Sequence, residues 1–91
     1  MDQCVNVTVK GRVQGVFFRA YTEEEARRQG LVGWVRNLPN GDVEAVMCGP
    51  EVNIESMVEW LHTGSPMASV KEVLVTGVES PEQLEGFEIR Y

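Results

Sequence analysis

The stretch Gly11-Arg12-Val13-Gln14-Gly15-Val16-Phe17-Phe18-Arg19 joins an alternating apolar run to a charged segment with a helical pattern. A glycine-containing turn between a strand and a helix start gathers several unpaired backbone N–H groups, with the positive end of the helix dipole behind them. Such a place binds anions, and the planar guanidinium of Arg19 favours a phosphate-like anion because it grips two oxygens at once. Short glycine turns also occur without any ligand, so the spacing alone leaves a structural and a functional interpretation open.

The residues on either side of this stretch predict a strand and a helix. Residues 4–10 alternate valines with polar or weakly polar side chains, which is typical of a half-buried strand. Residues 18–29 predict a helix that Gly30 ends in a left-handed conformation. Thr22 and Glu25 would form a capping box if the helix began four residues later. We favour the earlier start, because an anion site needs the first helical turn to face the loop. The inner stripe of this helix is expected to contain Phe18, Thr22 and Ala26, with Tyr21 and Gln29 as further candidates.

The rest of the chain predicts more strands and one more helix. Asn40-Gly41 is a strong hairpin signal between two expected strands, and Gly49-Pro50-Glu51 opens a second helix that Gly64 ends. The expected strands beyond the first cover residues 31–38, 42–48, 70–78 and 86–91. This order is the split βαβ pattern, an α+β fold in which an antiparallel sheet carries both helices on one face.

Length and composition indicate one domain, residues 1–91, which neither spans a membrane nor binds nucleic acid. With 43% apolar residues the chain can build a single core. No apolar run is long enough to span a membrane and the first residues do not resemble a secretory signal, so we expect a cytoplasmic protein. The net charge of −6 argues against a nucleic-acid partner. Attraction of an anion must therefore be local, from Arg19 and the loop amides, with Arg12 or Lys10 as further candidates.

Two motifs of this chain resemble the paired signature of the acylphosphatase family. The first is the stretch 11–19 quoted above, and the second is Gly33-Trp34-Val35-Arg36-Asn37. The resemblance continues through Tyr21-Thr22, Glu25-Ala26-Arg27, Trp60-Leu61, Gly64-Ser65-Pro66 and residues 87–91, so it covers essentially the whole chain. It implies a small ferredoxin-like domain that hydrolyses the carboxyl–phosphate bond of acyl phosphates. Such an enzyme is a hydrolase of phosphorus-containing anhydrides, and we expect it to be a monomer that needs neither metal nor cofactor.

The resemblance also assigns roles to residues of both motifs. The phosphoryl group is expected to be bound by Arg19 and by the loop backbone N–H groups of Gln14, Gly15, Val16, Phe17, Phe18 and Arg19. Asn37 is expected to position the attacking water, because a neutral amide orients water without adding charge against the phosphate. Alternation puts Asn37 on the same sheet face as Val35, which the helices should cover. The carboxylate leaving group needs no general acid, and we expect the substrate's own phosphate to take the proton of the water. Phe17 occupies a variable position of the family motif. Its side chain either borders the acyl group of the substrate or covers the core, and we favour the second role.

Purely structural roles compete with these assignments. Arg19 would have no catalytic role if it paired with an acid of the first helix, and Asn37 would have none if it bonded its own backbone before the Pro-Asn-Gly turn. Similar domains also occur in larger maturation proteins that process carbamoyl phosphate. The alternative to the hydrolase is therefore a carbamoyl-phosphate- or anion-binding ferredoxin-like module without turnover. The presence of both motifs favours the hydrolase.

The cysteines and the single histidine are expected to lie outside the site. Cys4 and Cys48 fall on the polar faces of neighbouring antiparallel strands, so the geometry permits a disulfide between them. In a reducing cytoplasm two free thiols are the expected state. His62 has no clustered Cys or Asp beside it, which indicates no metal site.

Overall fold

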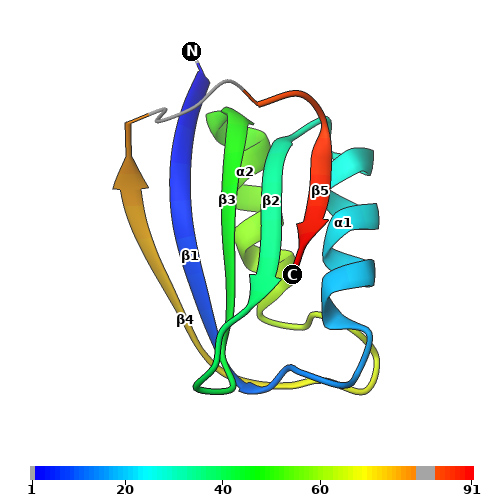
Figure 1. Ribbon diagram of the computed structural model, residues 1–91. Coiled ribbons are helices and arrows are strands. Elements are labelled where there is room, and N and C mark those ends of the chain that lie inside the picture. The colour runs from blue at the N-terminus through cyan, green and yellow to red at the C-terminus, as the bar shows by residue number, and fades with distance from the viewer. Residues whose placement is uncertain (1, 80–83) are drawn as a thin grey trace.

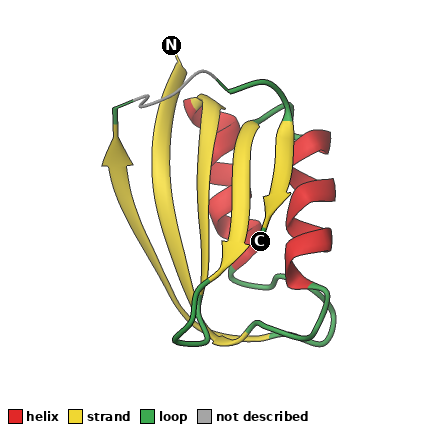
Figure 2. Ribbon diagram, in the orientation of Figure 1, coloured by secondary structure: helices red, strands yellow, loops and turns green. Residues whose placement is uncertain are grey.

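The computed structural model describes residues 2–79 and 84–91, which form one sheet covered on one face by two helices (Figures 1 and 2). In chain order the elements are β1 (Asp2–Arg12), α1 (Phe18–Arg28), β2 (Val32–Asn37), β3 (Val43–Pro50), α2 (Glu51–Leu61), β4 (Ser69–Val78) and β5 (Phe87–Arg90). The strands lie in the order β4-β1-β3-β2-β5. Every expected strand and helix is present, and the ferredoxin-like α+β fold is confirmed.

The sheet is antiparallel at three of its four strand pairs and parallel at the fourth. β5 runs parallel to β2, with Gly33 opposite Phe87 and Val35 opposite Ile89. Although β5 follows β4 in the chain, it lies at the opposite edge of the sheet, so no hairpin with β2 sets its direction. The expected antiparallel sheet is therefore a mixed one.

The strand directions bring several element ends to one end of the molecule. β1 and β2 are both antiparallel to β3, and β5 is parallel to β2, so β1, β2 and β5 all end on the same side. The loop 13–17 follows β1 there and leads directly into α1, as the lower part of Figure 1 shows. The fold thus places the loop, the start of α1 and the last residues of β2 and β5 close together.

The core lies between the sheet and the two helices. Val7 and Val9 of β1 are fully buried beneath the helices, as their alternation predicts. The helices contribute Phe18, Thr22 and Ala26 from α1 and Ile54, Met57 and Leu61 from α2. α1 begins at Phe18, so the later start at a capping box is wrong. Tyr21 is exposed and Gln29 lies beyond the last turn of α1, so neither belongs to the buried stripe.

The second face of the sheet is not covered by a helix, and it carries a disulfide between Cys4 and Cys48. The two residues are direct partners in the β1–β3 ladder, with Cα atoms 4.1 Å apart. The expectation of two free thiols is therefore wrong. That expectation was based on a reducing cytoplasm. The alternation of both strands was compatible with a disulfide between the two cysteines.

Removing this disulfide is expected to lower the free energy of unfolding by about 3 kcal/mol, because the bond closes a long loop and restricts the unfolded chain. The two cysteines are 44 residues apart in sequence, so this restriction is large. The measurement is urea unfolding of the native chain and of the Cys4→Ser/Cys48→Ser variant, each with and without dithiothreitol. Reductant should destabilise the native chain and leave the variant unchanged. Equal midpoints for the native chain in both conditions would contradict the disulfide.

Candidate active site

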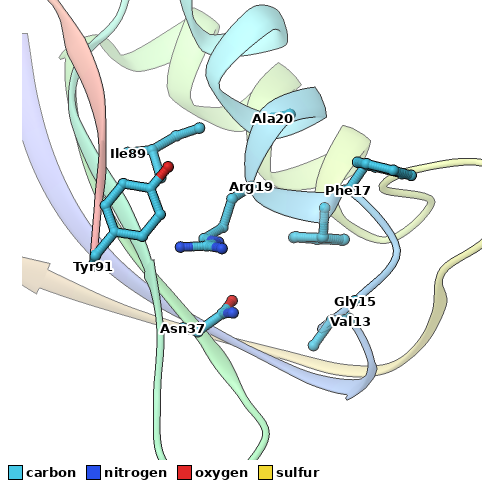
Figure 3. A pocket seen from close by; sticks show the side chains of 9 residues that line it. Val13, Gly15, Phe17, Arg19, Ala20, Asn37, Ile89 and Tyr91 are labelled. Atoms are coloured by element: carbon cyan, nitrogen blue, oxygen red, sulfur yellow. The ribbon is translucent and has the colours of Figure 1, made fainter.

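A pocket of about 310 Å³ opens where the loop 13–17, the start of α1 and the ends of β2 and β5 meet (Figure 3). The residues that line it are Val13, Gly15, Phe17, Phe18, Arg19, Ala20, Asn37, Ile89 and Tyr91. Both motifs of the sequence and the last residues of the structure contribute to it. The first motif alone contributes five of these side chains or backbone positions, so the loop forms most of the wall.

The loop holds its backbone in conformations that favour anion binding. Gly15 has φ 72°, and Phe17 has φ 59° and ψ 23°, the left-handed region that residues with a Cβ rarely adopt. Among the described residues Phe17 is the one non-glycine residue with positive φ. Backbone strain of this kind costs about 1–3 kcal/mol and gathers at functional sites. Here it turns the chain from the loop into α1, and Gly15, Phe17 and the first turn of α1 line the pocket.

The first turn of α1 is left open for an anion. Phe17 is the N-cap residue, its side chain makes no capping hydrogen bond, and the first turn contains no acidic residue. Helix starts usually satisfy their unpaired N–H groups with a Ser, Thr, Asp or Asn cap. Because none is present, the amides and the helix dipole are available to a negatively charged ligand.

Arg19 extends from α1 into the centre of the pocket. Its guanidinium Nη1 donates to the backbone O of Arg90 at 3.5 Å, and its Cζ lies 4.8 Å from the ring centroid of Tyr91. It forms no ion pair with any acid that the structure describes, so the interpretation of Arg19 as the partner of a helix acid is wrong. β5 therefore supports the guanidinium from one side and leaves its remaining N–H groups free to bind oxygens.

Asn37 enters the same pocket from the end of β2. Figure 3 shows its carboxamide and the Arg19 guanidinium reaching into one hollow. Its side chain makes no hydrogen bond to another residue in the described part of the chain, and the neighbouring turn is closed by Asn40, whose Oδ1 accepts from Asp42 N at 3.0 Å. The local backbone role expected of an asparagine before a turn thus belongs to Asn40. The Asn37 amide remains available for a ligand or a water.

Gln14 joins the loop to the hairpin that carries Asn37. Its Nε2 donates to the backbone O of Leu38 and to that of Asp42, each at 2.8 Å. Lys10 adds an ion pair to Asp42 at 2.7 Å, and this hydrogen bond and the carboxylate charge raise the pKa of Lys10 against the opposing effect of burial. These contacts fix the loop relative to the end of β2, and hence Arg19 relative to Asn37.

The structure places the six residues predicted to bind substrate in two groups. Gly15, Phe17, Phe18 and Arg19 line the pocket, whereas Gln14 and Val16 do not. The Val16 side chain is buried in the core, and its carbonyl accepts a hydrogen bond from the buried Ser65 hydroxyl at 2.8 Å. Phe17 is 74% exposed, so the expectation that it covers the core is wrong. It borders the pocket instead.

A model of the acylphosphatase family matches residues 5–89. This chain belongs to the acylphosphatase family. It is 56% identical over 85 residues to an acylphosphatase of Haloquadratum walsbyi, covering 93% of this chain and 90% of that protein. The structure of an acylphosphatase from Coxiella burnetii matches with a TM-score of 0.93 at 43% identity, covering 98% of this chain and 93% of that one. The acylphosphatase from Bacillus subtilis matches over the full length of both chains with a TM-score of 0.93 at 41% identity.

Four lining residues of this acylphosphatase pocket were not predicted from the sequence. Val13 lies within the first motif and Ala20 directly follows it, while Ile89 lies in β5 and Tyr91 directly follows that strand. The alternation of Phe87, Ile89 and Tyr91 indicated which face of the sheet the last two side chains occupy. It did not indicate that β5 lies beside β2 and α1, which is what brings them to Arg19.

Replacing Gln14 by alanine is expected to lower the free energy of unfolding by about 1–2 kcal/mol, because two hydrogen bonds between loop and hairpin are lost. Turnover should fall as well, since Arg19 and Asn37 would no longer be held at a fixed position relative to each other. Thermal unfolding and kinetics of Gln14→Ala test this, with Gln14→Glu as a variant that keeps the length but loses the donors. Unchanged stability of Gln14→Ala would contradict the bridging role.

The described residues contain no group of three or more His, Cys, Asp or Glu side chains placed to hold a metal ion. Within residues 2–79 and 84–91 no helix has the length and apolar character needed to cross a membrane.

Proposed function

We propose that this member of the acylphosphatase family hydrolyses the carboxyl–phosphate bond of small acyl phosphates, giving a carboxylate and inorganic phosphate. The observation that carries the proposal is the pocket in which an uncapped helix start meets an arginine and a carboxamide that have no ion-pair or side-chain hydrogen-bond partner, respectively, among residues 2–79 and 84–91. Two sources of hydrogen-bond donors, the guanidinium and the backbone amides, surround a space suited to a phosphoryl group, and the neutral carboxamide beside them suits a water.

Arg19 and the loop amides bind and neutralise the phosphoryl oxygens. A guanidinium offers parallel N–H donors that match two of these oxygens, and the backbone N–H groups of Gly15 to Arg19 serve the others. The charge on the equatorial oxygens persists through the transition state, so donors fixed in advance stabilise it without reorganisation. Tyr91 and the Arg90 carbonyl keep the guanidinium in place.

Asn37 orients the nucleophilic water. The water oxygen forms a new bond to phosphorus while the bond from phosphorus to the acyl oxygen breaks, and the electron pair leaves with the carboxylate. The carboxylate is a stable anion, so no acid is needed to protonate it. The proton of the water passes to a phosphoryl oxygen of the substrate, because the lining residues include no carboxylate or imidazole side chain that would act as a base.

This assignment of the proton predicts the pH dependence of the reaction. At pH values above the pKa of the substrate phosphate, kcat for benzoyl phosphate should stay constant up to about pH 9, since no protein side chain titrates in the mechanism. The measurement is a pH–rate profile at saturating substrate. The profile would instead show that a side chain takes the proton if the apparent pKa of one limb shifted on replacement of a protein carboxylate or of His62 but stayed the same with a different substrate.

One assay separates the hydrolase from a binding module without turnover. The hydrolase releases benzoate and phosphate from benzoyl phosphate, whereas a carbamoyl-phosphate- or anion-binding module would only be protected against heat by phosphate. We also propose that the chain acts as a monomer, because Arg19, Asn37 and the loop amides of one chain suffice for the roles given above. Light scattering at assay concentration tests this, and a dimer mass would contradict it.

A further inference from the structure

The connection between α2 and β4 contacts the loop 13–17 from the core. Residues 62–68 form this connection and lie at the same end of the molecule as the loop (Figure 1). Ser65 is 1% exposed, and its Oγ donates to the backbone O of Val16 at 2.8 Å. Ser65 does not line the pocket, whereas Gly15 and Phe17, on either side of Val16, do. The hydroxyl therefore contacts the loop from its buried side.

The neighbours of Ser65 hold it in this position. Gly64 has φ 64°, and its N–H donates to the backbone O of Trp60 at 2.8 Å, which ends α2. A Cβ on Gly64 would overlap the ring of Phe18, so glycine is required for this close approach to the start of α1. On the other side, the N–H of Ala68 donates to the backbone O of Ser65 at 3.0 Å and closes a turn. Ser65 is thus fixed between two turns.

The hydrogen bond from Ser65 sets the orientation of the peptide group between Val16 and Phe17. The described residues contain no cis peptide bond, so the C=O and the N–H of this group point in opposite directions. Because the carbonyl is directed to the buried hydroxyl, the Phe17 N–H points away from it. The N–H groups of residues 15–17 donate to no other group in the described part of the chain. The Phe17 N–H is therefore free to bind a ligand.

The observed orientation is the strained one for Phe17. Rotating this peptide group by half a turn would exchange the directions of its C=O and N–H. The same rotation would bring φ of Phe17 from 59° to about −120°, which residues with a Cβ adopt readily. It would also leave the Ser65 hydroxyl without its acceptor. The hydrogen bond thus favours an orientation that the backbone preference of Phe17 opposes.

We propose that Ser65 is a positioning residue for phosphoryl binding. It holds the Val16–Phe17 peptide group with its C=O in the core and its N–H toward the phosphoryl group. The rotated peptide would remove this donor and present a carbonyl oxygen, with its partial negative charge, to the anion. The proposal rests on the proposed function for the identity of the anion. A serine with a purely structural role would lower stability and leave the pocket of the folded protein unchanged.

The test measures binding of inorganic phosphate by calorimetry, at a temperature well below the unfolding midpoint of each protein. Ser65→Ala is compared with the native chain and with two controls. Ser56→Ala removes another serine hydroxyl, one on α2 that accepts a hydrogen bond from Gln29 Nε2 at 2.9 Å. Cys4→Ser/Cys48→Ser is the stability control, because it is expected to destabilise the fold and neither cysteine lines the pocket.

Ser65→Ala should bind phosphate about tenfold more weakly than the native chain, and kcat/KM for benzoyl phosphate should fall at least as much. Both controls should stay within about twofold of the native values. Adding Phe17→Gly to Ser65→Ala should restore about threefold in affinity, because glycine adopts positive φ without strain and so loses the preference for the rotated peptide. A loss that only reflected lower stability would not be restored in this way.

Backbone amide NMR of the native chain tests the same point without any variant. Saturating phosphate should move the Phe17 amide proton signal downfield, as expected for a new hydrogen bond, and the shift should be smaller in Ser65→Ala. Native phosphate affinity of folded Ser65→Ala, an equal loss in the disulfide control, no recovery with Phe17→Gly or an unresponsive Phe17 signal would each overturn the role of Ser65. Failure of the native chain to turn over benzoyl phosphate would overturn the hydrolase proposal instead, and phosphate binding would still decide the role of Ser65.

Discussion

Replacing Arg19 by alanine is expected to lower kcat/KM for benzoyl phosphate by about 10⁴-fold, in the range seen when an arginine that stabilises phosphoryl-transfer charge is removed. The guanidinium carries the one side-chain positive charge in the pocket and lacks a competing acid among the described residues. Inhibition by inorganic phosphate should weaken as well, because the same group binds the ground state. Steady-state kinetics with phosphate as a competitive inhibitor measure both effects.

Arg28→Ala is the matched control for this variant. Arg28 lies on the same helix, but its guanidinium is exposed and pairs with Glu24 and Glu25, far from the pocket. Its loss should leave kcat/KM within about twofold of the native value. Circular dichroism and thermal unfolding of Arg19→Ala exclude a folding defect. Near-native turnover by a folded Arg19→Ala protein would remove the basis of the assignment.

Replacing Asn37 by alanine is expected to lower kcat by about 10³-fold while phosphate inhibition changes by less than about threefold. In the proposed mechanism the amide contacts the water rather than the phosphoryl group, so its loss should act on the transition state and not on ground-state binding. The carboxamide has no hydrogen-bond partner in the described part of the chain, so its removal should also leave the stability of the hairpin nearly unchanged.

Two companion variants sharpen the result for Asn37. Asn40→Ala removes the amide that closes the neighbouring turn, so it should lower stability and leave kcat nearly native. Asn37→Asp keeps the shape but adds a negative charge, so it should weaken phosphate binding as well as turnover. If Asn37→Ala raised KM and the phosphate inhibition constant with unchanged kcat, the residue would be a binding group and not a water-positioning one.

Periodicity and glycine or proline positions in the sequence predicted the element order and the face on which Asn37 lies, because each depends on local chemistry. The helix start at Phe18 was chosen over a capping box at Thr22 because an anion site needs the first helical turn to face the loop. The site residues Arg19 and Asn37 followed from the two motifs. Features that depend on distant contacts were missed. The parallel β2–β5 pair follows from where β5 docks, and with it the support of Arg19 by Tyr91.

Two other features escaped prediction for different physical reasons. The pairing of Cys4 with Cys48 was geometrically visible from the strands, but the redox environment decides whether such a pair is bonded, and the sequence carries no local signal for it. The side chain of Gln14 reaches two carbonyls across the hairpin, a contact that no spacing rule encodes.

The central claim is that the pocket positions a water for attack on phosphorus while Arg19 and the loop amides hold the phosphoryl group. Hydrolysis of benzoyl phosphate in water enriched in oxygen-18 tests it most directly, with mass spectrometry of both products after a short incubation. The label is expected to enter inorganic phosphate, and benzoate should remain unlabelled. Label in benzoate would place the attack on the carbonyl carbon and contradict the roles given to Arg19 and Asn37.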